Sequence, residues 1–400
     1  MPPSSRALSR KTAIVGVGET SYGRDYREGR AKLAGYEPPL PENLAKQAFD
    51  RALADCGLRP SEIDGLSVSF TYGGPSPKEM AGILGLQPEF LIENGNIMAG
   101  PLPVVCEAIA SGKAKTVAMI YSVAARAIGR DYGGSTYSGG TGAPSSYYYY
   151  HPWGWSSQAA HWAMIFSHYQ HVFGVSEQDL SHVAIELRKN AMKTPDAIMQ
   201  TPIDIEQYMA SRYIVRPLHL FDLCLVNDGA VCLIVSSADL AKDQVAAPVE
   251  VAGWGAAKVQ HDKLHFMVRE RLRPQMQDAA GQAFAMAGLE LADIGHFEGY
   301  DAASIHLVNQ LEGYGFAEPG TGIAPFRAGE TGPEGLLPVN TSGGNMSGSY
   351  MHGWSQVAEC VRQLRGSALG RQIPGLSASM FSLAQTDQAH PIIFTNRAAK

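Results

Sequence analysis

Strand-like and helix-like patterns of apolar positions alternate along the chain, and the same order occurs twice. In the first half, a buried strand, an amphipathic helix and a second strand are expected at residues 11–18, 43–56 and 65–70. In the second half, the same three elements are expected at 249–255, 278–287 and 295–300, with the helix about one turn shorter. Strands that alternate with helices in two tandem halves favour parallel-type sheets with helices packed on them.

Short sequence matches support an internal duplication. Both predicted helices contain Gln-Ala-Phe, and in both halves a Gly-Leu turn begins six residues before an isoleucine, Ile63 or Ile294. Further along each half, a glycine-rich segment opens a helix, and a final pair of strands is expected near 375–394. Overlaying Gly100 on Gly353 places Ile97 opposite Tyr350.

A long insertion at 123–240 separates the two halves, so we expect three parts: 11–122, 123–240 and 241–400. The front of the insertion is rich in glycine, serine and tyrosine, and includes an aromatic run at 147–155. Loops of this length in a compact fold are usually functional or disordered. The aromatic run is suited either to lining a large apolar substrate or to binding a partner, and the sequence leaves both open.

Composition narrows the class of protein. The chain has 400 residues, 45% of them hydrophobic, which is enough for a large core, and its net charge of −6 argues against a nucleic-acid partner. We expect no membrane span, because no apolar run approaches about 20 residues. The N-terminus shows no apolar signal segment, and the five cysteines lack disulfide or metal spacing, so reduced thiols and a cytoplasmic location are expected.

Two tyrosines stand out. Tyr300 lies in the segment His-Phe-Glu-Gly-Tyr-Asp-Ala-Ala-Ser, and Tyr350 ends the segment Asn-Thr-Ser-Gly-Gly-Asn-Met-Ser-Gly-Ser-Tyr. These frames resemble the C-terminal signatures of the thiolase superfamily, especially its sterol-carrier-protein-type branch, and the likeness runs from Ala13 to about Thr395. In that family the first frame carries His or Asn at position 300, and the second carries the catalytic His at position 350.

The resemblance implies an α/β thiolase fold, in which two similar β/α halves form a five-layered αβαβα core with a loop-domain insertion. Members of the family carry catalytic cysteines at two positions. In this chain these positions fall on Ile97 and on or next to Met380, so neither cysteine is present. Cys106 lies about two turns into an apolar helical run, where a core residue is expected. The sequence therefore predicts neither an acyl-enzyme nucleophile nor a thiol acid/base, and thiolysis or Claisen condensation is not expected.

The expected chemistry is retro-aldol cleavage of a β-hydroxyacyl-CoA, with Tyr300 and Tyr350 sharing the proton transfers. Asp301, His352 and Asn345 are candidates for a relay or for oxyanion stabilisation. Thiolase-fold aldolases of steroid side-chain degradation carry the same replacement by tyrosines, and they cleave a 17-hydroxy steroid side-chain acyl-CoA into a 17-keto steroid and propionyl-CoA. The resemblance implies no cofactor and no metal, with the acyl-CoA as substrate.

Other interpretations stay open. The chain can act on another acyl-CoA, for instance an aromatic one, or be a non-catalytic thiolase-like subunit of a heteromeric complex. A tyrosine at a strand end is often only a packing residue, and His352 comes two residues after the family His position. Relatives of this branch work with a small OB-fold partner that completes the acyl-CoA site. The resemblance thus implies a homodimer that binds such a partner.

Overall fold

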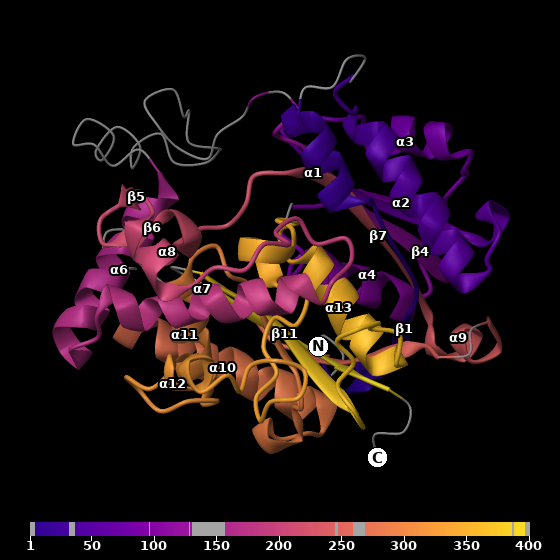
Figure 1. Ribbon diagram of the computed structural model, residues 1–400. Helices are drawn as coiled ribbons and strands as arrows, with labels where there is room; N and C mark the ends of the chain where they lie inside the picture. The colour runs from indigo at the N-terminus through magenta and orange to yellow at the C-terminus, as the bar shows by residue number, and fades with distance from the viewer. Residues whose placement is uncertain are drawn as a thin grey trace, which may run out of the picture.

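The computed structural model describes residues 5–31, 37–95, 97–127, 129, 157–244, 247–258, 269–385 and 388–396. The aromatic run at 147–155 lies outside these residues. The described chain is a mixed α/β structure in which one 10-stranded sheet, made of two similar parts that we call the sheets of the two halves, lies between layers of helices (Figure 1).

The sheet of the first half has the strand order β1-β7-β4-β2-β3. Its strands are β1 (Thr12–Glu19), β2 (Gly65–Thr71), β3 (Phe90–Glu93), β4 (Thr116–Ala124) and β7 (Asp228–Ser237). Three helices pack against it, namely α2 (Pro41–Cys56), α3 (Pro77–Leu84) and α4 (Pro101–Ala110). Close packing of α2 requires glycine in β1, because a Cβ at Gly18 would collide with the backbone of Ala48.

The sheet of the second half has the order β10-β11-β12-β8. Its strands are β8 (Val249–Trp254), β10 (Phe297–Gly299), β11 (Ala378–Gln385) and β12 (Gln388–Thr395), with β9 (Ala257–Lys258) paired to β12. Its helices are α10 (Arg269–Ala287), α11 (Ser304–Tyr314) and α13 (Trp354–Arg365). Gly255 in this half lies against the backbone of Ala279 in α10, as Gly18 lies against α2.

The duplication extends to the helix termini. Gly100 and Gly353 are the N-cap residues of α4 and α13, so the sequence overlay of these two glycines is confirmed. Gly57 and Gly288, which follow α2 and α10, both have positive φ. The expected length of the second helix was wrong, however. Helix α10 has 19 residues and α2 has 16, and Pro274 inside α10 obscures its first turns in the sequence pattern.

The sheets are mixed rather than parallel throughout. Strand β2 pairs in parallel with β3 and β4, and β10 pairs in parallel with β11. Strands β7 and β12 run antiparallel to their neighbours in the two sheets. The reason is clear for β12, because only two residues separate it from β11 and so short a connection can join only antiparallel strands.

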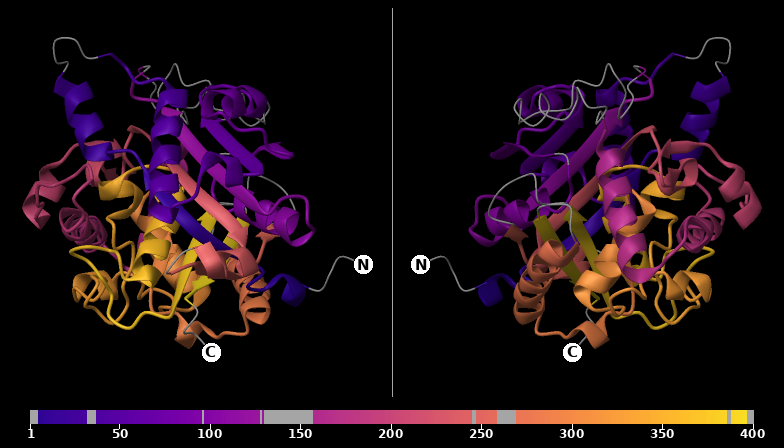
Figure 2. Two further views of the ribbon diagram at one scale, coloured as in Figure 1. Left: turned by 90° about the vertical axis from the view of Figure 1, so that its right-hand side faces the viewer. Right: turned by 90° about the vertical axis from the view of Figure 1, so that its left-hand side faces the viewer.

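The central layer holds the two halves together. Helix α13 contacts β10 and β11 of its own sheet and also β1 and β7 of the other sheet. Helices α2 and α10 cover the outer faces of the two sheets (Figure 2). This arrangement confirms the expected five-layered thiolase fold. The sheets also meet at one edge, where β1 and β8 pair over two residues.

The segment between β4 and β7 contributes helices beside the second half. It forms α6 (Gln158–Phe173), α7 (Glu177–Met192) and α8 (Ile205–Ala210), with a small sheet of β5 (Tyr213–Val215) and β6 (Leu218–His219). Helix α7 packs against the π-helical turn η6 (Gly344–Gly348), which directly precedes Tyr350. The remaining helices are α1 (Tyr22–Ala31), α9 (Ala238–Gln244) and α12 (Ala324–Arg327). Within the described ranges, no helix is both long and apolar enough to span a bilayer.

Candidate active site at the tyrosine pair

The hydroxyl oxygens of Tyr300 and Tyr350 lie 2.8 Å apart, within hydrogen-bonding distance. Both side chains are buried, with only 2% and 7% of their surfaces exposed. Tyr300 follows β10 at its carboxyl end, and Tyr350 precedes α13 by four residues. The two tyrosines are 50 residues apart in the chain. The fold therefore brings together two tyrosines that are distant in the sequence. In the sequence, only the resemblance of their segments to thiolase motifs relates them to each other.

Backbone hydrogen bonds fix the position of each tyrosine. The amide of Tyr300 donates to the carbonyl of Ser382 at 2.8 Å, and its carbonyl accepts from Gln310 Nε2 at 2.8 Å. The amide of Tyr350 donates to Asn227 Oδ1 at 2.8 Å. The main chain at both positions is thus anchored from neighbouring segments.

Asp301 connects the two tyrosine segments. Its fully buried carboxylate accepts hydrogen bonds from the amide of Asn345 at 2.9 Å and from Gln356 Nε2 at 3.3 Å. Burial raises the pKa of Asp301 well above its usual range, against the opposing effect of the Asn345 amide. Asn345 in turn donates from Nδ2 to Gln356 Oε1 at 3.2 Å. Both residues therefore hold the turn that leads to Tyr350.

His352 lies directly beside the pair. Its ring centroid is 4.5 Å from that of Tyr350, and its Nδ1 is hydrogen-bonded to the hydroxyl of Tyr121 on β4. Burial lowers the pKa of His352 to about 4, so the ring is neutral near pH 7. Of the three candidate relay residues, His352 is the one whose side chain packs on a tyrosine ring.

The position of the first family cysteine lies near the start of α4. Ile97 precedes a short turn, and Gly100 then begins the helix. The amide of Met98 donates to the carbonyl of His352 at 3.1 Å, so this turn lies against the Tyr350 segment. Cys106 is fully buried within α4, where desolvation raises its pKa to about 12, as expected of a core residue.

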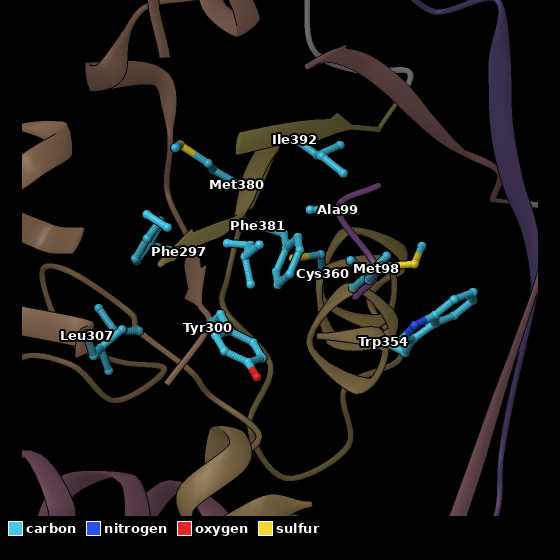
Figure 3. Packing of buried hydrophobic residues seen from close by; sticks show 14 of the residues in the cluster. Met98, Ala99, Phe297, Tyr300, Leu307, Trp354, Cys360, Met380, Phe381 and Ile392 are labelled. Atoms are coloured by element: carbon cyan, nitrogen blue, oxygen red, sulfur yellow. The ribbon is translucent and has the colours of Figure 1, made fainter. Parts of the chain in front are cut away.

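The position of the second family cysteine shows a different arrangement. Met380 is fully buried in β11, and its side chain points away from Tyr300, whereas Phe381 lies between Tyr300 and Cys360 (Figure 3). The ring of Phe381 also lies against Gly353. Because successive side chains of a strand point to opposite faces, only the residue next to Met380 faces the tyrosines. Of the expected positions on or next to Met380, Phe381 is therefore the one whose side chain lies on the side of Tyr300.

Two aromatic side chains near Tyr300 were not predicted as site residues, because no motif or spacing in the sequence points to them. The ring of His306 on α11 lies edge-on to Tyr300 at a centroid distance of 5.7 Å and stacks on Trp162 of α6 at 4.4 Å. Burial lowers the pKa of His306 to about 4. Trp162 belongs to the insertion, so no spacing within a single half of the duplication could have linked it to Tyr300.

Comparisons with known proteins identify the family of the chain. Residues 256–387 match the family described as Thiolase C-terminal domain-like. The chain is 32% identical over 373 residues, 90% of its length and 91% of the relative's, to a steroid side-chain-cleaving aldolase of Thermomonospora curvata. The chain belongs to the thiolase superfamily.

Other members of the superfamily extend the comparison. The chain is 33% identical to the 17-hydroxy-3-oxo-4-pregnene-20-carboxyl-CoA lyase of Mycobacterium tuberculosis, over 90% of this chain and 93% of the relative. The solved structure of an Ltp2-ChsH2(DUF35) aldolase matches 97% of this chain and 98% of its own, with a TM-score of 0.82 and 29% identity. Human mitochondrial 3-ketoacyl-CoA thiolase shares the fold, with a TM-score of 0.67 and 14% identity over 97% of this chain and 98% of its own.

Proposed function

We propose that this chain is an aldolase that cleaves a β-hydroxyacyl-CoA by a retro-aldol reaction. The proposed substrate is a 17-hydroxy steroid side-chain acyl-CoA, and the proposed products are a 17-keto steroid and propionyl-CoA. The relatives named as a steroid side-chain-cleaving aldolase and as a pregnene carboxyl-CoA lyase support this assignment. The observation that carries it is the 2.8 Å contact between the hydroxyls of Tyr300 and Tyr350.

The proposed reaction has two proton transfers. One tyrosine takes the proton of the β-hydroxyl, the carbon–oxygen bond becomes a carbonyl, and the Cα–Cβ bond breaks. The electron pair of that bond passes to the thioester as an enolate, and the second tyrosine supplies a proton to Cα. Atoms and charge balance without a covalent intermediate, and the scheme uses no cofactor besides the acyl-CoA substrate.

The contact between the two hydroxyls suits a reaction in which each tyrosine carries out one proton transfer. Only one hydrogen lies between two hydroxyl oxygens in contact, so the accepting hydroxyl can direct its own hydrogen elsewhere. A phenolate formed at one tyrosine is stabilised by a charge-assisted hydrogen bond from the other. Asp301 and Asn345 are proposed to position the Tyr350 segment, because their hydrogen bonds hold the preceding turn.

We also propose a cytoplasmic homodimer that binds a small OB-fold partner. The support is the similar solved structure, whose name gives a second component, ChsH2(DUF35), beside Ltp2. The test is the mass of the chain in light scattering, alone and together with a candidate OB-fold protein. A monomer that is fully active alone contradicts the proposed assembly.

The proposed activity is tested with Tyr300→Phe and Tyr350→Phe against a panel of steroid and aromatic β-hydroxyacyl-CoAs. Each variant should lower kcat by about 10²–10⁴-fold with little change in KM, because the hydroxyls act in the transition state. The matched control is Tyr169→Phe, which removes a buried hydroxyl that bonds Glu312 at 2.5 Å. Turnover of either active-site variant within a few-fold of the parent identifies that tyrosine as a packing residue. A non-catalytic subunit predicts no cleavage by the wild-type chain.

A further inference from the structure

The backbone at His352 adopts a conformation that non-glycine residues rarely take. Its φ is 48°, and in the described parts of the chain only Arg10, Tyr72 and Asn340 are other non-glycine residues with positive φ. Such strain persists where the surrounding structure enforces it, and it is concentrated at functional sites. Here the carbonyl of His352 accepts from Met98 and the next residue, Gly353, begins α13. The imidazole itself contacts the ring of Tyr350 at a centroid distance of 4.5 Å and that of Tyr121 at 5.4 Å.

A chain of hydrogen bonds reaches this imidazole from the sheet of the first half. Thr71, the last residue of β2, lies with its Oγ1 3.0 Å from the hydroxyl oxygen of Tyr121, and that hydroxyl contacts His352 Nδ1. Tyr121 is fully buried and stacks on Trp354 at a centroid distance of 5.7 Å, so its ring has a fixed position. Burial raises the pKa of Tyr121, which keeps the hydroxyl protonated and able to donate.

The direction of these bonds decides which ring nitrogen carries the hydrogen. A neutral imidazole has one donor and one acceptor nitrogen. If Thr71 donates to Tyr121 and Tyr121 donates to Nδ1, the hydrogen of His352 is on Nε2. That nitrogen is then a hydrogen-bond donor on a ring that packs against Tyr350.

We propose that His352 is a catalytic residue that donates its Nε2 hydrogen to the thioester oxygen as the enolate forms, with Tyr121 as the positioning residue that fixes the tautomer. This inference rests on the proposed aldolase function. Tyr300 and Tyr350 serve the two proton transfers, and the negative charge of the enolate oxygen needs a further donor. A fixed neutral donor at a developing oxyanion is among the strongest contributions to catalysis.

The test compares His352→Gln with His352→Asn. A glutamine amide nitrogen reaches the position of Nε2, whereas an asparagine amide nitrogen reaches only that of Nδ1. Asparagine is the better substitute for structure, because it tolerates positive φ and can still bond Tyr121. We expect His352→Asn to lose about 10²–10³-fold in kcat at unchanged melting temperature, the loss typical of one removed oxyanion donor, and His352→Gln to retain more activity than His352→Asn. An active His352→Asn enzyme overturns the proposal.

The role of Tyr121 is tested by ¹⁵N spectra of histidine-labelled protein, with His352→Asn identifying the signal. The wild type should show the Nε2–H tautomer at pH 7, and Tyr121→Phe should show a mixture and a lower kcat at similar KM. Tyr169→Phe is again the control and should change neither. An Nδ1–H tautomer in the wild type overturns the inference. A wild-type chain that cleaves no acyl-CoA overturns the proposed function, and the spectra still decide the tautomer.

Discussion

At the scale of single residues, the site depends on how closely the tyrosine segments approach each other. Gly344 has a φ of 57°, and a Cβ there would overlap the Asp301 carboxylate and lie 2.7 Å from Asn340 Nδ2. The absence of a side chain at this position lets the Asp301 carboxylate reach the amides of the turn before Tyr350. Gly344 thus permits the contact between Asp301 and the turn that leads to Tyr350.

Gly344→Ala should therefore impair both stability and turnover. Gly366→Ala is the matched control, because Gly366 also has positive φ, 74°, and a Cβ there has no atom within 4 Å. Gly366→Ala should lower the free energy of unfolding by about 1–2 kcal/mol through backbone strain alone. It should keep full activity. Gly344→Ala should cost more and lower kcat at least tenfold. Equal stability and activity of the two variants would show that the contact with Asp301 is unimportant.

At the scale of elements, a buried polar network fastens α13 to β10. On α13, Glu359 accepts from Arg371 Nη2 at 2.6 Å and from Thr341 Oγ1 at 2.7 Å, and Thr341 contacts His296 at 3.1 Å. His296 also contacts Glu298 at 3.1 Å. The Arg371 charge holds the pKa of Glu359 down to about 2 against desolvation, while burial raises the pKa of Glu298 well above its usual range. The network therefore contains one carboxylate paired with an arginine, Glu359, and a second carboxyl group, Glu298, whose pKa is raised.

Arg371→Met should destabilise the protein strongly, because it leaves the Glu359 carboxylate buried without its countercharge. The expected loss is about 3–5 kcal/mol in urea unfolding, and adding Glu359→Gln should recover part of it. Arg327→Met is the control, since its pair with Asp179 is largely exposed and should be worth at most about 1 kcal/mol. Similar losses from the two arginine variants would contradict this account of the network.

Most elements were predictable from the sequence, and the site only in part. Strands 12–19 and 65–71 and the helix ending at Cys56 follow local periodicity, and the Gly100–Gly353 overlay gave the correct helix starts. The second cysteine position was located only as on or next to Met380, and in a strand a shift of one residue reverses the side-chain direction. Tyr121 and His306 were missed because Tyr121 reaches His352, and His306 reaches Tyr300, only through tertiary packing, which local patterns do not encode.

At the scale of the whole molecule, buried neutral histidines make stability depend on pH. Burial lowers the pKa values of His296, His306 and His352 to about 4 from an ordinary value of 6.5. Between these values the unfolded chain binds protons that the folded chain does not. The free energy of unfolding therefore falls as the pH decreases from about 6.5 toward 4. Glu298 and Asp301, whose pKa values are raised, act in the opposite direction.

His306→Phe isolates one of these contributions while keeping a ring against Trp162. As the pH falls below 6, the free energy of unfolding should decrease more steeply for the wild type than for the variant. The difference in slope should be up to about 1.4 kcal/mol per pH unit. The measurement is urea unfolding at pH 7, 6 and 5 for both proteins. Parallel curves would mean that His306 takes up its proton equally in the folded and unfolded states.

The position of the last two strands has a consequence for synthesis on the ribosome. Strands β11 and β12, which end at Thr395, lie between β10 and β8, and α13 lies between strands of both sheets. Until β12 has left the exit tunnel, β8 lacks its pairing with β12, and until β11 has left it, the carbonyl of Ser382 cannot hold Tyr300. The nascent chain therefore exposes apolar surface on the first sheet until α13 has been synthesised. The two phenols can take up their positions only after β11 has followed.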